Sequence, residues 1–155
     1  MPSHTHVTDL PGRVGEQLGA SDWREITQKQ IDMFADATGD HQWIHVDAER
    51  AAAGPYGGTI AHGFLTISMV PALMAEIWEI DGIDMMVNQG LRELKLRAPV
   101  PVGSRVRLVA TLTSHRARPR GFAELVVGCV IEAETAGEVK KAATGEVVLL
   151  VHEAV

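Results

Sequence analysis

The second half of the chain contains four long stretches in which apolar and polar residues alternate. The stretches are Met85–Arg97, Ser104–Arg116, Phe122–Glu134 and Lys140–His152. In the second stretch, Val106, Leu108 and Ala110 would point to one side of an extended strand. Segments rich in proline or glycine separate the stretches. Alternation of this kind predicts an antiparallel sheet with one covered face.

The stretch from Gly63 to about Ile80 is apolar around nearly its whole circumference when it is read as a helix. Such a helix belongs in a protein interior. Pro71 lies within it, so we expect a kink or a break there. A buried helix followed by a long meander predicts an α+β fold in which a curved antiparallel sheet wraps around a central helix. We expect one domain over residues 1–155, with residues 1–12 as a flexible tail.

An acid and a histidine follow the end of a well-signalled helix. Thr27 and Gln30 have the spacing of a capping box, and Gly39 is placed to end the helix in a left-handed conformation. Asp40 and His45 come next. Five residues apart on a continuous helix, they would point about 140° away from each other. The loop after Gly39 would let them converge and hold one water molecule between them.

Composition argues against several classes of protein. The net charge of −6 disfavours a general nucleic-acid binder. No apolar run is long enough to cross a membrane and the N-terminus does not resemble a signal peptide, so we expect no membrane insertion and a cytoplasmic location. Cys129 is the only cysteine and lies in an apolar alternation, which favours a buried structural thiol. The histidines lack metal-ligand spacing, so we predict no metal site.

Basic residues are concentrated between Arg92 and Arg120. The segment contains eight basic residues and one acidic residue, Glu93, so its net charge is +7. The rest of the chain therefore carries a net charge of −13. Arg105 and Arg107 could bind a phosphorylated ligand or an acidic carrier protein. The alternative is that this basic strip, the segment Arg92–Arg120, consists only of solvated strand faces and turns.

Two segments resemble a known family. Residues Ala37–Asp47 read ATGDHQWIHVD, and residues Ala61–Leu65 read AHGFL. Together they resemble the MaoC-like hydratase/dehydratase family, also called hydratase 2, and the Gln-Trp-Ile-His form is similar to the branch that includes nodulation protein N. Arg97–Gly103 also resembles a strand connection of that family. The resemblance implies a hotdog fold, in which an antiparallel sheet wraps a long helix and which is usually paired into a dimer or a double hotdog. We expect a homodimer, although the sequence does not distinguish it from a heteromeric assembly.

The resemblance also implies an activity and a site. Members of the family reversibly hydrate trans-2-enoyl thioesters to (R)-3-hydroxyacyl thioesters, with coenzyme A or acyl-carrier protein as the thioester carrier. No separate cofactor is expected, because coenzyme A is part of the substrate. The catalytic pair of the family matches Asp40 and His45, and the glycine whose N–H binds the thioester oxygen matches Gly63. We expect Asp40 to be the general base, although the two roles could be exchanged.

Other residues are weaker candidates for substrate binding. Gln42 and Trp43 stand where many hydratases have Asn-Pro, so they are expected to influence the shape of the pocket. Trp43 could line the acyl pocket or pack into the core, and Gly58 could let its loop approach the ligand closely. His62 is interpreted as a structural residue.

Two alternative functions remain open from the residues alone. Thioesterases of this fold often place a carboxylate on the central helix, but no acidic residue lies between Gly63 and Ala75, and Glu76 would be more than three turns along. The other alternative is a non-catalytic subunit of a heteromeric dehydratase. The presence of both Asp40 and His45 argues against that role.

Overall fold

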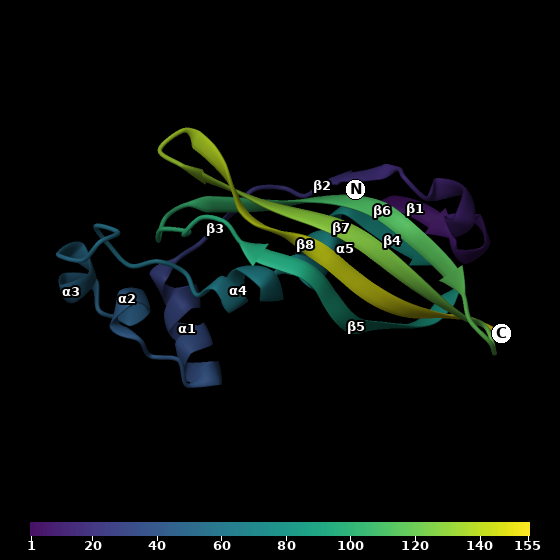
Figure 1. The fold of residues 1–155 in the computed structure, drawn as a ribbon, viewed down its shortest axis with the longest axis horizontal. Helices are drawn as coiled ribbons and strands as arrows, with labels where there is room; N and C mark the ends of the chain where they lie inside the picture. Colours follow the sequence, from purple (N-terminus) through teal and green to yellow (C-terminus); the bar gives the residue numbers. More distant parts are fainter.

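The computed structural model describes all of residues 1–155, and Figure 1 shows their arrangement. The elements in chain order are β1 (Ser3–His6), the 3-10 helix η1 (Val7–Arg13), β2 (Gln17–Ala20), β3 (Arg24–Glu25), α1 (Gln28–Thr38), α2 (Trp43–Val46), α3 (Ala48–Ala52), α4 (Gly63–Ser68), α5 (Val70–Ile77), β4 (Trp78–Asp81), β5 (Ile83–Leu96), β6 (Arg105–Ala117), β7 (Phe122–Thr135) and β8 (Glu138–Glu153). The protein is therefore α+β, as predicted.

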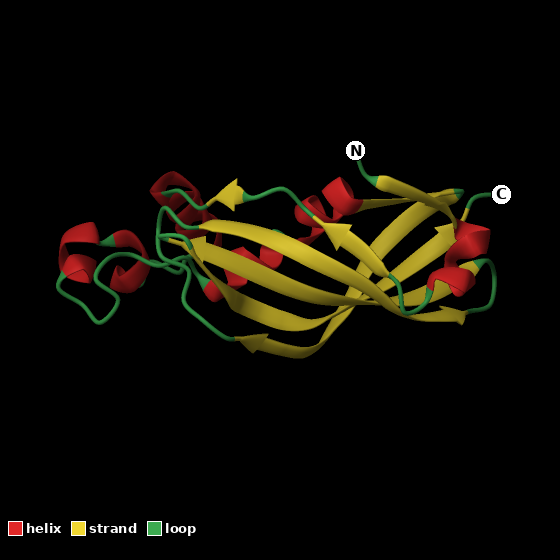
Figure 2. Cartoon of the chain, turned by 90° about the horizontal axis from the view of Figure 1, so that it is seen from above, coloured by secondary structure: helices red, strands yellow, loops and turns green.

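The main sheet is antiparallel and curved. Its strands follow the order β2-β6-β7-β8-β5, and β3 also pairs with β6. Figure 2 shows the sheet bending around the central helical segments. The side chains that β6 turns inward are fully buried; they are Val106, Leu108, Ala110 and Leu112. The four alternating stretches therefore form the long strands β5 to β8, with one face of β6 covered as predicted.

The central helix is divided into two pieces. Met69 separates α4 from α5, and Pro71 is the second residue of α5. Proline is tolerated in a first helical turn because its missing N–H would have no partner there. The predicted break is confirmed. The predicted end near Ile80 is wrong, because the backbone becomes extended at Trp78 and enters β4.

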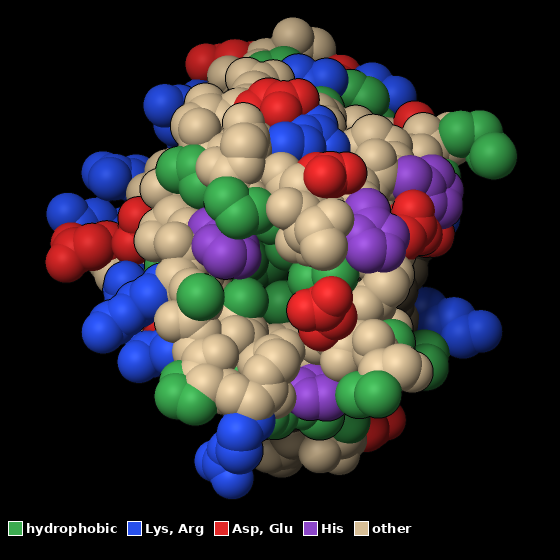
Figure 3. Space-filling view, turned by 90° about the vertical axis from the view of Figure 1, so that its right-hand side faces the viewer, with side chains coloured by type: hydrophobic (Ala, Val, Ile, Leu, Met, Phe, Trp, Pro, Cys, Tyr) green, Lys and Arg blue, Asp and Glu red, His purple; other side chains and the backbone are tan.

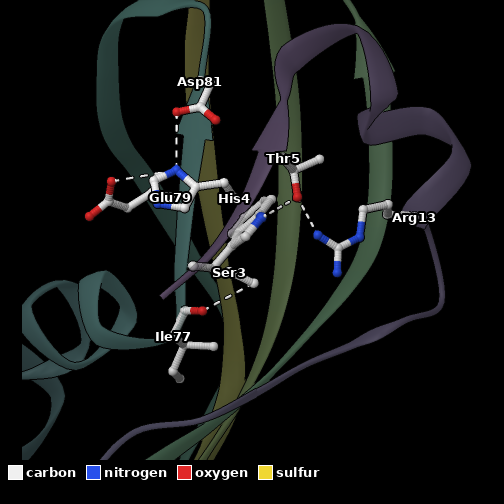
Figure 4. Close-up of polar contacts among 8 residues, drawn as sticks. Ser3, His4, Thr5, Arg13, Ile77, Glu79 and Asp81 are labelled. Atoms are coloured by element: carbon white, nitrogen blue, oxygen red, sulfur yellow. Dashed lines mark hydrogen bonds and ion pairs between the residues drawn. The ribbon is translucent and has the colours of Figure 1, made fainter. Parts of the chain in front are cut away.

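The prediction of a flexible tail over residues 1–12 is also wrong. Strand β1 pairs in parallel with β4, and Leu10 of η1 is fully buried. Figure 4 shows the polar contacts of this segment, in which Thr5 accepts hydrogen bonds from Arg13 and from Trp78 Nε1. The segment is ordered by β4, which lies more than seventy residues further along the chain.

The three helices α1, α2 and α3 lie together at one end of the sheet (Figure 1). The capping box of Thr27 and Gln30 is present, and Gly39 ends α1 with a φ of 84°. Asp47 caps α3 by accepting a hydrogen bond from Arg50 N at 3.0 Å. The loop that carries Asp40 therefore begins at Gly39 and ends where α2 starts at Trp43.

The opposite end of the molecule is seen face-on in Figure 3. Histidine and acidic side chains surround a hollow with hydrophobic side chains on its floor. Among the strands that meet at this end, His4 Nδ1 lies 3.2 Å from Asp81 Oδ1, and His152 Nδ1 lies 2.8 Å from Asp84 Oδ1. No helix of the protein combines the length and the apolar character needed to cross a membrane.

Candidate active site

Asp40 lies in the exposed loop between α1 and α2. Its Oδ1 accepts a hydrogen bond from Gln42 N at 3.3 Å, an arrangement typical of an aspartate that shapes its own turn. Its other carboxylate oxygen makes no hydrogen bond within the chain. Asp40 therefore shapes the loop and still offers one free carboxylate oxygen.

His45 is a buried residue of the short helix α2. Its Nδ1 lies 2.7 Å from the backbone oxygen of Ile60. A carbonyl oxygen can only accept a hydrogen bond, so Nδ1 carries the proton and Nε2 has a free lone pair in the neutral ring. The backbone oxygen of His45 accepts a further bond from Gln28 Nε2 at 2.8 Å. These contacts fix both the tautomer and the backbone of His45.

Asp40 and His45 converge across the loop, as expected. Side-chain nitrogen or oxygen atoms of Asp40, His45 and a third residue, His62, all lie within 4.8 Å of one another. A water molecule with hydrogen bonds of about 2.8 Å could bridge two groups at that separation. The loop released by Gly39 thus produces an acid–histidine pair that is suited to holding water.

His62 is the residue of this group whose place sequence reasoning did not foresee. It is 2% exposed, and its ring stacks on the His45 ring with 3.9 Å between centroids and 25° between planes. Its Nε2 lies 2.9 Å from the backbone oxygen of Asp40. The one feature of the sequence that could have indicated a place for His62 at the site is its position directly before Gly63 in the AHGFL segment.

The group formed by Asp40, His45 and His62 also contains the ligand types that bind divalent metal ions. Spacing along the sequence could not reveal this group, because its members come from three segments. The two imidazole rings are stacked with 25° between their planes, so their in-plane lone pairs lie in two separate layers and do not meet at one position between the rings. This orientation suits hydrogen bonding to water better than coordination of one ion.

A cavity of about 290 Å³ lies beside His45. Its lining includes His45, Gly63, Thr66, Leu96 and Arg97. Gly63 is the first residue of α4, where backbone N–H groups have no partner within the helix. A Cβ atom at Gly63 would collide with the Leu96 side chain of β5. The cavity therefore joins the histidine, a free backbone donor and an apolar wall.

The other residues that were expected to bind substrate do not line this cavity. Trp43 is half-buried outside it, with the Arg50 guanidinium 4.4 Å from its ring centroid and Gly54 against its ring. Gln42 directly precedes α2 and has an exposed side chain. Gly58 lies in the loop between α3 and α4. The structure thus places the Trp43 ring of α2 against Arg50 of α3 and against Gly54.

Arg105 and Arg107 are likewise separate from the cavity. Arg105 Nε lies 2.6 Å from Glu134 Oε2, Arg107 Nε lies 2.7 Å from Glu132 Oε2, and both guanidinium groups lie over the Trp23 ring. Carboxylates of β7 therefore neutralise these two positions of the basic strip. The expectation that Arg105 and Arg107 bind the substrate has no support from this placement.

Arg97 is the basic residue that does line the cavity. Its Nε donates to Thr144 Oγ1 at 2.9 Å, and no carboxylate forms an ion pair with it. The sequence identified Arg97 as one of the eight basic residues of the strip and as the first residue of the Arg97–Gly103 connection, but not as a substrate-binding residue. Its uncompensated charge at the rim was hidden among the other arginines of the strip.

The family model described as MaoC like domain matches residues 9–132. The chain is 46% identical over 146 residues to 3-hydroxyacyl-thioester dehydratase Z of Mycobacterium tuberculosis H37Rv, which covers 94% of this chain and 95% of the relative. It is 41% identical to nodulation protein N of Rhizobium leguminosarum bv. viciae, over 94% of this chain and 91% of the relative.

The fold also has solved relatives. The unliganded R-hydratase PhaJ1 from Pseudomonas aeruginosa superposes with a TM-score of 0.68 at 23% sequence identity. The likeness covers 90% of this chain and 82% of that one. At this level of identity, the comparison describes the fold.

Proposed function

Since this chain belongs to the MaoC-like dehydratase family and is a hydro-lyase, we propose that it reversibly hydrates trans-2-enoyl thioesters to (R)-3-hydroxyacyl thioesters. Its fold is the hotdog arrangement of that family. The observation that supports the proposal most strongly is the convergence of Asp40 and His45, within 4.8 Å, beside a cavity whose lining includes Gly63.

The chemistry requires a base, a proton for carbon and stabilisation of an enolate. Asp40 takes a proton from a water molecule, which is also held by the free Nε2 of His45, and the water oxygen bonds to the β-carbon of the substrate. The carbon–carbon double bond becomes an enolate, and a proton from the acid–histidine pair is then delivered to its α-carbon. A positioned acid or base contributes about 10²–10⁴ in rate. The reverse sequence is dehydration.

Gly63 supplies the oxyanion donor in this proposal. Its N–H belongs to the first turn of α4 and so has no helical acceptor. The thioester oxygen becomes negatively charged as the enolate forms, and a fixed N–H donor stabilises that charge. Losing one such donor typically lowers the rate by about 10²–10³.

The substrate carrier is proposed to contact Arg97. Coenzyme A and the prosthetic arm of acyl-carrier protein are both phosphorylated, and the Arg97 guanidinium at the cavity rim has no carboxylate partner. A phosphate group placed there would gain a charge-assisted hydrogen bond. Arg97 thus takes the binding role that the sequence suggested for Arg105 and Arg107.

A thioesterase reaction is less compatible with the site. Glu76 is the only acidic residue of α4 and α5. Its carboxylate accepts hydrogen bonds from Arg24 and from the backbone N–H of Asp22. The cavity beside His45 contains no carboxylate from α4 or α5. Asp40 does not line this cavity either, and in the proposed hydratase it acts through the water molecule that it shares with His45.

The activity can be tested with purified protein and a short trans-2-enoyl-CoA. We expect loss of the conjugated enoyl absorbance and formation of the (R)-3-hydroxyacyl product, identified by chiral chromatography. A thiol reagent in a parallel sample measures free coenzyme A. Folded protein that hydrates no enoyl-CoA of any chain length would contradict the proposal, and release of coenzyme A without a hydroxy product would favour the thioesterase.

We further propose that two copies of the chain form a homodimer through β5. This strand is an edge strand of the main sheet and pairs only with β8. Several large apolar side chains of β5 are exposed; they are Met85, Met86, Val87, Leu91 and Leu96. A long apolar edge strand with free backbone groups readily pairs with another chain. Edge pairing between two copies would extend the sheet and cover these side chains.

A further inference from the structure

We propose that His62 is a positioning residue, which holds the Asp40 loop, the His45 ring and the start of α4 in one geometry. The inference rests on the proposed hydratase function. His62 contacts Asp40 through a hydrogen bond and His45 through ring stacking, and it directly precedes Gly63. The three proposed catalytic groups come from three segments of the chain, and His62 connects all of them.

The contact with Asp40 anchors an exposed loop. The carbonyl oxygen of Asp40 can only accept, so the hydrogen bond at 2.9 Å comes from an N–H at His62 Nε2. The carboxylate of Asp40 bonds only to Gln42 N, two residues away. The bond from His62 is therefore the one hydrogen bond that ties Asp40 to a distant part of the chain.

The contact with His45 fixes the direction of its free nitrogen. The bond from His45 Nδ1 to Ile60 O restrains one edge of the ring, and the stacked His62 ring restrains one face. His62 is itself packed against Phe34 of α1, with 4.8 Å between ring centroids. Rotation of the His45 ring would break at least one of these contacts, so Nε2 keeps its orientation.

Packing alone does not account for a histidine at this position. His62 Nδ1 is buried and has no hydrogen-bond partner. Leaving a buried polar atom unpaired lowers stability. A phenylalanine ring would fill a similar space without that loss, but it could not donate to Asp40. The polar contact with the catalytic loop is therefore the feature that distinguishes histidine from an apolar ring.

Two variants separate the two contacts. His62→Phe keeps a flat ring against His45 but loses the donor, while His62→Gln keeps an amide donor that can reach the Asp40 carbonyl but loses the stacked ring. His152→Gln is the matched control. At the opposite end of the molecule, His152 Nε2 also bonds a backbone carbonyl, that of Arg120, and its ring also packs against an aromatic ring, that of Phe122.

We expect His62→Phe to lower kcat for a short enoyl-CoA about 100-fold while KM changes less than about twofold, because a small misplacement of catalytic groups has that effect. His62→Gln should recover about tenfold of this loss by restoring the Asp40 contact. His152→Gln should retain wild-type kcat. If both His62 variants are folded and keep wild-type kcat, His62 only packs and the proposal is overturned.

A measurement independent of activity accompanies the kinetics. Nitrogen NMR of the ring should show His45 of the wild type as the neutral tautomer protonated at Nδ1. In His62→Gln, which lacks the stacked ring, the His45 ring can turn away from Ile60 O and should show a mixture of tautomers. If the His45 tautomer is unchanged in His62→Gln, the proposal is overturned. A wild type that hydrates no substrate would defeat the hydratase proposal, whereas the NMR result would still decide the role of His62.

Discussion

The arginines around the sheet differ in what neutralises them, and this difference leads to a prediction. Arg105 is paired with Glu134, whereas Arg97 at the cavity rim has no carboxylate partner. We expect Arg97→Gln to raise KM for an enoyl-CoA about tenfold with little change in kcat, because one charge-assisted hydrogen bond is lost. Arg105→Gln is the control and should leave KM unchanged. The opposite pattern in steady-state kinetics would place the carrier on β6.

Cys129 provides a test of the core at the level of one atom. Burial raises the pKa of its thiol to about 12. Only the thiolate reacts with disulfide reagents, so native protein at about pH 8 should not react with such a reagent over minutes. Addition of urea should expose the thiol and give one equivalent of product. Rapid reaction of the native protein, followed by absorbance, would show that β7 is not buried as described.

Gly63 at the start of α4 lies against Leu96 of β5, and this contact allows a test at the level of elements. Gly63→Ala would push Leu96 out of its position, and Leu96 lines the cavity. We expect kcat to fall about 10²-fold, as for loss of an oxyanion donor. Adding Leu96→Ala removes the collision and should restore most of the activity. A double variant as slow as Gly63→Ala would mean that the new methyl group itself obstructs the substrate.

Most elements could be predicted because their causes are local. Alternation located the strands β5 to β8 to within a few residues, and the caps at Thr27 and Gly39 followed from side-chain chemistry. Two predictions failed because long-range pairing decided the outcome. Strand β1 contains the polar sequence SHTH, and it is a strand only because β4 pairs with it. The same pairing ends α5 at Ile77, although the apolar sequence continues.

The site was predictable only in part. Asp40, His45 and Gly63 could be identified from motifs within single segments. The place of His62 could not, because its partners Asp40 and His45 approach it only after α1, α2 and α4 have packed. The charge of the strip was misleading for the same reason, since the acids that neutralise Arg105 and Arg107 lie on the neighbouring strand β7.

The whole molecule is expected to assemble as a dimer through β5. Met86→Lys introduces a charge on this strand and should shift the protein toward the monomer in analytical ultracentrifugation. Met33→Lys on α1 is the matched control, because Met33 is exposed to a similar degree. The control should sediment as the wild type. A monomeric wild type, or a dimer unaffected by Met86→Lys, would exclude assembly through this edge.

The central claim is that Asp40 and His45 together activate water in this molecule. Its most direct test is kcat for hydration of a short trans-2-enoyl-CoA by Asp40→Asn and His45→Gln, with Asp36→Asn as the control for an exposed carboxylate on α1. We predict that each substitution in the pair lowers kcat by about 10²–10⁴ in folded protein, while the control retains wild-type activity. Wild-type kcat in Asp40→Asn or His45→Gln would contradict the claim.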